Sequence, residues 1–304
     1  MSIHDSAATV DSAIRSVIAQ TETGWELILI DDGSRDDGAD RVAAHNDPRI
    51  RIIRSGERKG LACRLNEAVG LARGAFIARM DADDICYPER LKSQVAFLQA
   101  NPDIDLVASK AIVFRRAGEI VGVMAPPVAH DDIIARAYNR FIFPHPTWCG
   151  RAAWFRTHRY DEAMPITQDQ ELLLRAAQHS RFATIDRILL GYRKEGISLS
   201  KSARGRILFS RALWRHAGES GTKRRAIAQM AKHIAIFAAD MAAIGLRAEE
   251  WLLRQKVGTT LTDDEAAQWR ALWRDVGAGD EPGLQVQAGA QSVRAPSSPK
   301  RPLS

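Results

Sequence analysis

Two short, largely apolar runs in this chain end abruptly in aspartates, and this pattern limits the possible folds more than any other feature. The run 26–30 leads into Asp31 and Asp32, and the run 75–80 leads into the acidic cluster 81–84. Short apolar runs bounded by polar loops are typical of buried strands. Strands buried on both faces indicate a sheet that is covered by helices on either side.

Helical segments separate these strands along the chain. We expect helices over 12–19 and 61–72 and from Pro88 to about residue 99, further strands over 49–53 and 105–109, and a hairpin at Ala117 and Gly118. Alternation of strands and helices predicts a parallel sheet, and ligands bind beyond the carboxyl ends of its strands. Both acidic loops should therefore face one crevice.

The composition fits an ordinary globular protein. The chain has 304 residues, 45% of them hydrophobic, and a net charge of +6 that is only a weak sign of an anionic ligand. Three cysteines without a CxxC pair predict neither a disulfide framework nor a zinc site. With no apolar run near the length of about 20 residues that spans a bilayer, and no export leader, a cytoplasmic location is expected.

The C-terminal third differs from the rest in composition. Residues 201–225 are rich in Lys and Arg and predict a basic helical segment. Apolar residues then recur at helical spacings, at Ile227, Met230, Ile234, Met241 and Ile244. We expect a helical extension over 201–277 and, because 278–304 lacks aromatic residues and contains four prolines, a disordered tail.

The acidic cluster suits a divalent metal ion. Three carboxylates within four residues, at Asp81, Asp83 and Asp84, repel one another unless a cation compensates them. Mg²⁺ or Mn²⁺ is held by one or two carboxylates together with water and substrate phosphates. A solvated acidic turn or a helix cap is the alternative.

From about Val10 to Ala108 the chain resembles the family 2 glycosyltransferases, in the stretches 25–34, 59–66, 78–85 and 88–91. The resemblance implies a GT-A fold, an α/β, Rossmann-like nucleotide-binding sandwich with a mostly parallel sheet. The catalytic domain would cover 1–200, with a nucleotide-sugar-binding half over 1–110 and an acceptor half over 111–200.

The resemblance also implies roles for the acids. Asp31 or Asp32 would contact the nucleotide base, and Asp81 would lie by the ribose or by a metal-bound water. Asp83, which should reach further into the crevice, would be the direct ligand of the metal.

Cations follow the strand 49–53. Lys59 and Arg64 lie in the loop and the helix start after it, where positive charge and free backbone N–H groups suit a diphosphate. We expect nucleotide-sugar contacts from this pair, whereas helix packing or capping explains Asn66, one turn further on, equally well.

A second match lies over 145–147 and 166–175. In the family this stretch looks like the acceptor side, and the resemblance implies that Asp169 deprotonates the acceptor hydroxyl. Gln168 replaces the usual Glu, and Lys194 stands where a histidine often lies. A carboxylate at a helix N-terminus stays ionised and ready to accept a proton, but Asp169 also suits a plain helix cap.

The chain also departs from the family at its start. Residues 1–5 look like the turn that follows the family's first strand. We therefore expect that strand to be missing, the start codon to lie inside the gene, and the incomplete sheet to destabilise the protein.

The leading hypothesis is metal-dependent, inverting transfer of a hexose from a nucleotide diphosphate sugar, UDP-linked, to a hydroxyl of a glycan or lipid-linked acceptor. A catalytically impaired nucleotide-sugar-binding protein is one alternative. A sugar nucleotidyltransferase is another, disfavoured because residues 2–20 contain no glycine for a phosphate loop. No nucleic-acid partner is expected, and 201–225 suits peripheral contact with anionic lipid at the inner face of the membrane.

Overall fold

The computed structural model describes residues 1–136, 143–196, 198–246, 257–258 and 261–277. Its first sheet has the order β1-β2-β3 and is parallel throughout. The strands are β1 (Ser2–Ile3), β2 (Leu27–Asp32) and β3 (Ile50–Ser55), and they alternate with the helices α1 (Val10–Ile18), α2 (Gly38–Ala44) and α3 (Leu61–Leu71). The predicted parallel, helix-covered arrangement is confirmed in this part of the chain.

The second sheet is mixed. Its order is β4-β8-β6-β9-β5, with β7 on the side of β6. Only β6 and β9 pair in parallel, and every other pair within the described part of this sheet is antiparallel. The strands are β4 (Phe76–Ala78), β5 (Ile85–Cys86), β6 (Leu106–Phe114), β7 (Ile120–Met124), β8 (Cys149–Arg151) and β9 (Phe182–Arg193).

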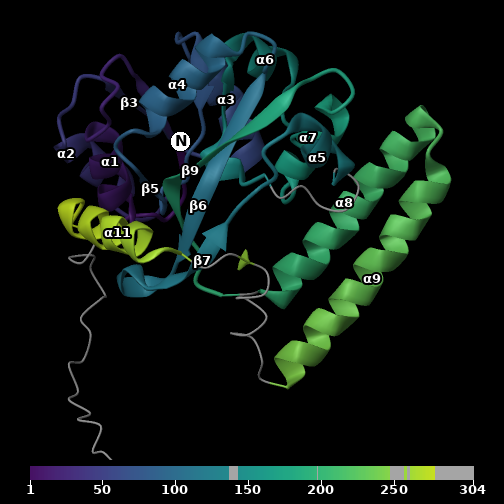
Figure 1. The fold of residues 1–304 in the computed structure, drawn as a ribbon. Helices are drawn as coiled ribbons and strands as arrows, with labels where there is room; N and C mark the ends of the chain where they lie inside the picture. The colour runs from purple at the N-terminus through teal and green to yellow at the C-terminus, as the bar shows by residue number, and fades with distance from the viewer. Residues whose placement is uncertain (137–142, 197, 247–256, 259–260, 278–304) are drawn as a thin grey trace, which may run out of the picture.

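The remaining helices cover this sheet or extend from it (Figure 1). The α-helices are α4 (Arg90–Ala100), α5 (His130–Ala135), α6 (Ala152–Thr157), α7 (Gln168–Ala176), α8 (Leu199–Ser220), α9 (Lys223–Gly245) and α11 (Asp263–Asp275), and the short 3-10 turns are η1 (Arg116–Gly118) and η2 (His145–Thr147). The helices predicted over 12–19, 61–72 and 88–99 are confirmed to within two residues. The predicted hairpin is confirmed as well, with left-handed backbone at Ala117 and Gly118 joining β6 to β7.

The strand that we expected to be missing is present as two residues. Ser2 and Ile3 pair with β2, and the Met1 amino group donates to the Ile28 carbonyl oxygen at 2.9 Å. Beyond Met1, a cavity of about 490 Å³ separates β2 from β4, which lies at the end of its sheet. Burial in this apolar surrounding lowers the pKa of the Met1 amino group to about 5.

Helix α11 belongs to the core and not to a separate extension. The Trp269 ring is fully buried, and its centroid lies 4.7 Å from that of Phe114 in β6. A side chain at position 191 in β9 would collide with Trp269, because a Cβ there would lie 2.3 Å from the indole. Glycine at this position makes room for the ring. The segment expected as an extension over 201–277 is thus divided between a projecting pair, α8 and α9, and a core helix. The tail expected over 278–304 lies outside the described residues.

Candidate functional site

A cleft of about 1310 Å³ opens where the two sheets meet the start of α7 and the pair α8–α9. Its walls come from segments far apart in the sequence: the N-terminal loop, the acidic cluster after β4, the start of α7, the end of β9 and one side of α8 and α9. The ionisable residues that line it are His4, Asp5, Asp81, Asp83, Arg116, Asp169, Tyr192, Arg193, Lys194, Glu195, Lys201, Arg206 and His233.

The acidic cluster is packed tightly at one side of this cleft. Carboxylate oxygens of Asp81, Asp83 and Asp84 lie within 4.8 Å of one another. The buried Arg79 guanidinium pairs with Asp81. Burial and the charge of Asp81 raise the pKa of Asp83 to about 6, in spite of the opposing effect of Arg193.

Asp84 lies behind the two cleft-lining acids and is fully buried. One of its oxygens accepts from the Arg193 backbone N–H at 3.0 Å, and the other has no hydrogen-bond partner within the described part of the chain. Burial and the charges of Asp83 and Asp81 raise the pKa of Asp84 well above its usual range. Ionisation of these neighbouring acids is therefore opposed by burial and by one another, and a bound cation would relieve that opposition.

These residues fit a hard divalent cation. Three carboxylates grouped this closely supply the oxygen ligands that Mg²⁺ and Mn²⁺ prefer, and the cleft leaves room for water and phosphate oxygens. The oxygen of Asp84 without a hydrogen-bond partner and the raised pKa of Asp83 both indicate that a bound cation would stabilise the ionised carboxylates.

Asp169 lines the same cleft from the first turn of α7. Thr167 precedes the helix in left-handed backbone, with φ of 64°, and the side chain of Asp169 is partly exposed. Gln168 and Gln170 on either side of it are buried, and Gln170 Nε2 donates to an Asp169 carboxylate oxygen at 3.5 Å. The partial positive charge of the helix N-terminus favours the ionised form of a carboxylate placed there.

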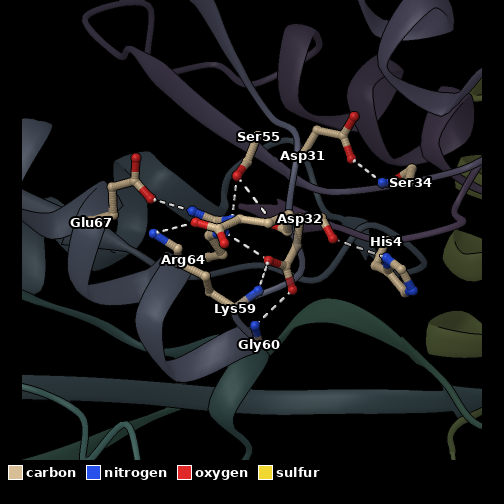
Figure 2. Close-up of polar contacts among 10 residues, drawn as sticks. His4, Asp31, Asp32, Ser34, Ser55, Lys59, Gly60, Arg64 and Glu67 are labelled. Carbon is tan, nitrogen blue, oxygen red and sulfur yellow. Dashed lines mark hydrogen bonds and ion pairs between the residues drawn. The ribbon is translucent and has the colours of Figure 1, made fainter.

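The other acidic loop is built differently (Figure 2). Asp32 is buried, and its two oxygens accept from the backbone N–H groups of Lys59 and Gly60 at 2.7 and 2.9 Å and from Arg64 Nε at 2.7 Å. Burial alone would raise the pKa of Asp32, but these donors outweigh burial and lower it. Gly60 has φ of 88°, a backbone conformation that favours glycine and lets the loop close over the carboxylate.

Several predicted binding residues lie inside this second network. Arg64 is buried and also donates to Ser55, Glu57 and Glu67, so its guanidinium is committed to the protein. The Lys59 ammonium pairs with Glu57 at 2.7 Å, and Asp31 accepts from the Ser34 backbone. Asp31, Asp32, Lys59 and Arg64 are not among the described residues that line the cleft, whereas Asp81, Asp83 and Asp169 are.

The sequence did not predict that two further parts of the chain line the cleft. The N-terminal loop contributes His4, whose ring nitrogen lies 3.1 Å from the Asp32 carbonyl oxygen, and Thr9, which donates to the Ala82 carbonyl oxygen at 3.0 Å. The helices α8 and α9 contribute Lys201, Arg206 and His233. No local motif marks these residues, because only long-range packing brings them to the acids.

Comparison with known proteins places the chain in a family. The model for "Glycosyl transferase family 2" matches residues 1–157, about half of the chain. The EpsE protein of Bacillus subtilis is 36% identical over 160 residues, which are 52% of this chain and 56% of EpsE. A UDP-Glc:alpha-D-GlcNAc-diphosphoundecaprenol beta-1,3-glucosyltransferase of Escherichia coli, WfgD, is 35% identical over 101 residues, 33% of this chain and 40% of WfgD.

Solved structures agree on the fold. The S. aureus TarS fragment 1–349 superimposes with a TM-score of 0.59 at 18% identity, over 90% of this chain and 78% of that one. A Pyrobaculum calidifontis mannosyltransferase, PcManGT, in complex with GDP-Man and Mn²⁺, gives 0.52 at 16% identity, over 91% and 83%. The chain spans a little over half the length of EpsE. With the motifs, the sheet order and the family match in agreement, the chain belongs to glycosyl transferase family 2 and has the GT-A type of fold.

Proposed function

We propose that this protein transfers a sugar from a nucleotide diphosphate sugar, UDP-linked, to a hydroxyl of a glycan or a lipid-linked acceptor. One observation carries the proposal: a single cleft is lined by Asp81 and Asp83 on one side and by Asp169 on another. Such a cleft has room for a donor and an acceptor together. The name of the E. coli relative, which specifies UDP-Glc and a diphosphoundecaprenol-linked sugar, supports this choice of substrates.

In the proposed reaction, the Asp169 carboxylate accepts the proton of the acceptor hydroxyl. The hydroxyl oxygen then bonds to the anomeric carbon, while the bond from that carbon to the diphosphate oxygen breaks and leaves its electron pair on the diphosphate. Direct displacement of this kind inverts the anomeric configuration. Asp169 is suited to this role because its partly exposed carboxylate lines the cleft from the first turn of α7.

The donor would be held by the opposite wall. Asp81, Asp83 and Asp84 would hold Mg²⁺ or Mn²⁺, with Asp83 as the direct ligand, and the ion would neutralise charge on the departing diphosphate. Lys194 and Lys201 line the cleft and offer further positive charge for the phosphates. Direct nucleotide contact by Asp31, Asp32, Lys59 or Arg64 stays a prediction, and their contacts support an additional role in holding the loop 57–60.

The test is release of the nucleotide from UDP-glucose, UDP-GlcNAc or GDP-mannose in the presence of Mn²⁺. We expect Asp83→Ala and Asp169→Ala each to lower the rate by at least about 100-fold, because each removes a group that acts on the reacting atoms. Asp263→Ala is the matched control for Asp169, since Asp263 also lies in the first turn of a helix but outside the cleft.

Undiminished turnover in both Asp83→Ala and Asp169→Ala would contradict the proposal. Calorimetric binding of UDP without any sugar release by the wild type would instead favour a nucleotide-sugar-binding protein. We place the protein in the cytoplasm, where nucleotide sugars are made, at the inner face of the membrane when its acceptor is lipid-linked.

A further inference from the structure

Helices α8 and α9 form a hairpin that projects from the domain, with α9 as the outer helix (Figure 1). The helices are joined by an ion pair between Arg206 and Asp240 at 2.8 Å and by contact of the Phe209 and His233 rings. Gly221, in left-handed backbone, ends α8 and allows the reversal. One side of α9 therefore packs on α8, and the other faces outward.

The polarity of α9 is the reverse of that of an ordinary surface helix. The residues turned toward the protein include Gln229, His233 and Asp240, which are at most 8% exposed. The outward residues include Ile227, Ile234 and Met241, which are 55%, 72% and 47% exposed. These three recur every seven residues and so lie along one line of the helix, which we call the apolar line of α9.

The sequence predicted an amphipathic helix over this segment, and the helix is confirmed. Its apolar line, however, does not face the core. Among the described helices, Lys223–Gly245 alone is long and apolar enough to cross a membrane, by length and composition only. The ion pair to Asp240 and the polar side that packs on α8 fit a helix that lies along an interface better than one that crosses it.

The same hairpin also carries positive charge. Helix α8 exposes Arg204 and Arg211, which we call the basic stripe, and α9 begins with three consecutive basic residues, 223–225. Trp214, 47% exposed, lies in the same part of α8, with the Lys223 ammonium 6.0 Å from its ring. Exposed Lys and Arg beside an aromatic residue and an apolar helix face suit anionic headgroups above acyl chains.

We propose that the α8–α9 hairpin binds the surface of an anionic lipid bilayer. The apolar line of α9 enters the outer part of the acyl region, and the basic stripe and residues 223–225 contact the headgroups. A second copy of the chain fits less well, because pairing two such hairpins would bring their positive charges together. The contact predicted for 201–225 thus extends to α9, which supplies the apolar part.

The same hairpin forms a wall of the cleft, through Lys201, Phe209 and Ile236. Binding of the hairpin to a bilayer would therefore hold the cleft beside the lipid surface. This consequence rests on the proposed function: an acceptor sugar that is linked to a membrane lipid would reach Asp169 without leaving the membrane.

Co-sedimentation of the full chain with vesicles tests the proposal. We expect binding to vesicles of phosphatidylglycerol and phosphatidylcholine in equal parts, and at least about tenfold weaker binding to phosphatidylcholine alone. Ile234→Glu should weaken binding to the anionic vesicles about tenfold or more, because it places a carboxylate in the apolar line. Arg204→Gln with Arg211→Gln should weaken it and reduce its dependence on salt.

Val128→Glu is the matched control, since Val128 is an exposed apolar residue outside the hairpin, 50% exposed. Circular dichroism checks that each variant is folded. The proposal is overturned if the wild type stays in the supernatant with anionic vesicles, or if Val128→Glu loses as much binding as Ile234→Glu. It is also overturned if light scattering without lipid shows a dimer that Ile234→Glu dissociates. Because no donor or acceptor is present, this outcome is independent of the test of sugar transfer.

Discussion

The two acidic loops that follow buried strands have the same pattern in the sequence and opposite electrostatics in the structure. Around Asp32, the backbone of Lys59 and Gly60 and the Arg64 side chain supply donors, and the pKa of the carboxyl is lowered. Around Asp84, one oxygen has no partner in the described part of the chain, and the pKa is raised.

The difference shows how similar strand ends come to serve different purposes. A buried carboxylate whose donors all come from the protein stabilises a loop and has little capacity for a ligand. A carboxylate group that lacks donors keeps that capacity at a cost in stability. In this protein the Asp32 carboxylate holds the loop 57–60 against β2, and Asp84 in the loop after β4 keeps a carboxylate oxygen without a hydrogen-bond partner in the described part of the chain.

The comparison predicts its largest effect at Arg64. Arg64→Leu leaves the buried Asp32 carboxylate without its charged partner, and we expect the free energy of unfolding to fall by about 3–5 kcal/mol. Urea denaturation measures the change. Arg54→Leu is the control, because its pair with Asp40 is exposed and should contribute at most about 1 kcal/mol. Equal losses of unfolding free energy in the two variants would show that the buried Arg64–Asp32 pair contributes no more to stability than the exposed Arg54–Asp40 pair.

The acidic cluster should respond to metal in a way that the Asp32 loop does not. At a Mn²⁺ concentration of about 100 times its dissociation constant, the free energy of unfolding should rise by about 2.7 kcal/mol. Thermal denaturation with and without Mn²⁺ measures this stabilisation as an increase in Tm. Asp83→Ala should abolish the rise, and Asp263→Ala should keep it. A Tm that Mn²⁺ leaves unchanged in the wild type would speak against a metal at this cluster.

The smallest expected effect on stability distinguishes the Asp84 carboxylate from the Asp32 carboxylate. In metal-free protein at neutral pH, Asp84→Asn should raise the free energy of unfolding by about 1 kcal/mol, because it removes a buried carboxyl group whose ionisation is opposed by burial and by the neighbouring acids. The gain should shrink as the pH falls, since protonation then neutralises Asp84 in the wild type too. Asp32→Asn should have the opposite sign, as its donors favour the charged form. Urea denaturation with a chelator present distinguishes the two.

Much of the N-terminal fold was predictable because its signals are local. The apolar runs that end at Asp31 and Asp81 place two strands and their loops, and helical spacing places α1, α3 and α4. Helix α2 escaped prediction because it is only seven residues long and has no strong periodic pattern.

The rest depends on contacts between distant residues. Nothing near Arg64 in the sequence indicates that its side chain turns inward to Asp32 and not outward to a phosphate. The same holds for Trp269, which needs the bare backbone of Gly191 to pack against β9. For α9, spacing predicts that apolar residues share a line, but it does not say which side of the helix meets the protein.

The buried amino group of Met1 has a practical consequence for anyone who produces this protein. Residues joined to Met1 would leave through the groove between β2 and β4, whose walls include Leu27, Phe76 and Ile77. A polyhistidine tag fused to Met1 would place bulky polar side chains between β2 and β4. A short apolar spacer could instead pair with the edges of these strands. Two preparations that differ only in a tag joined to Met1 should therefore differ in their free energy of unfolding. The position of the tag then becomes a variable to control before any activity is compared.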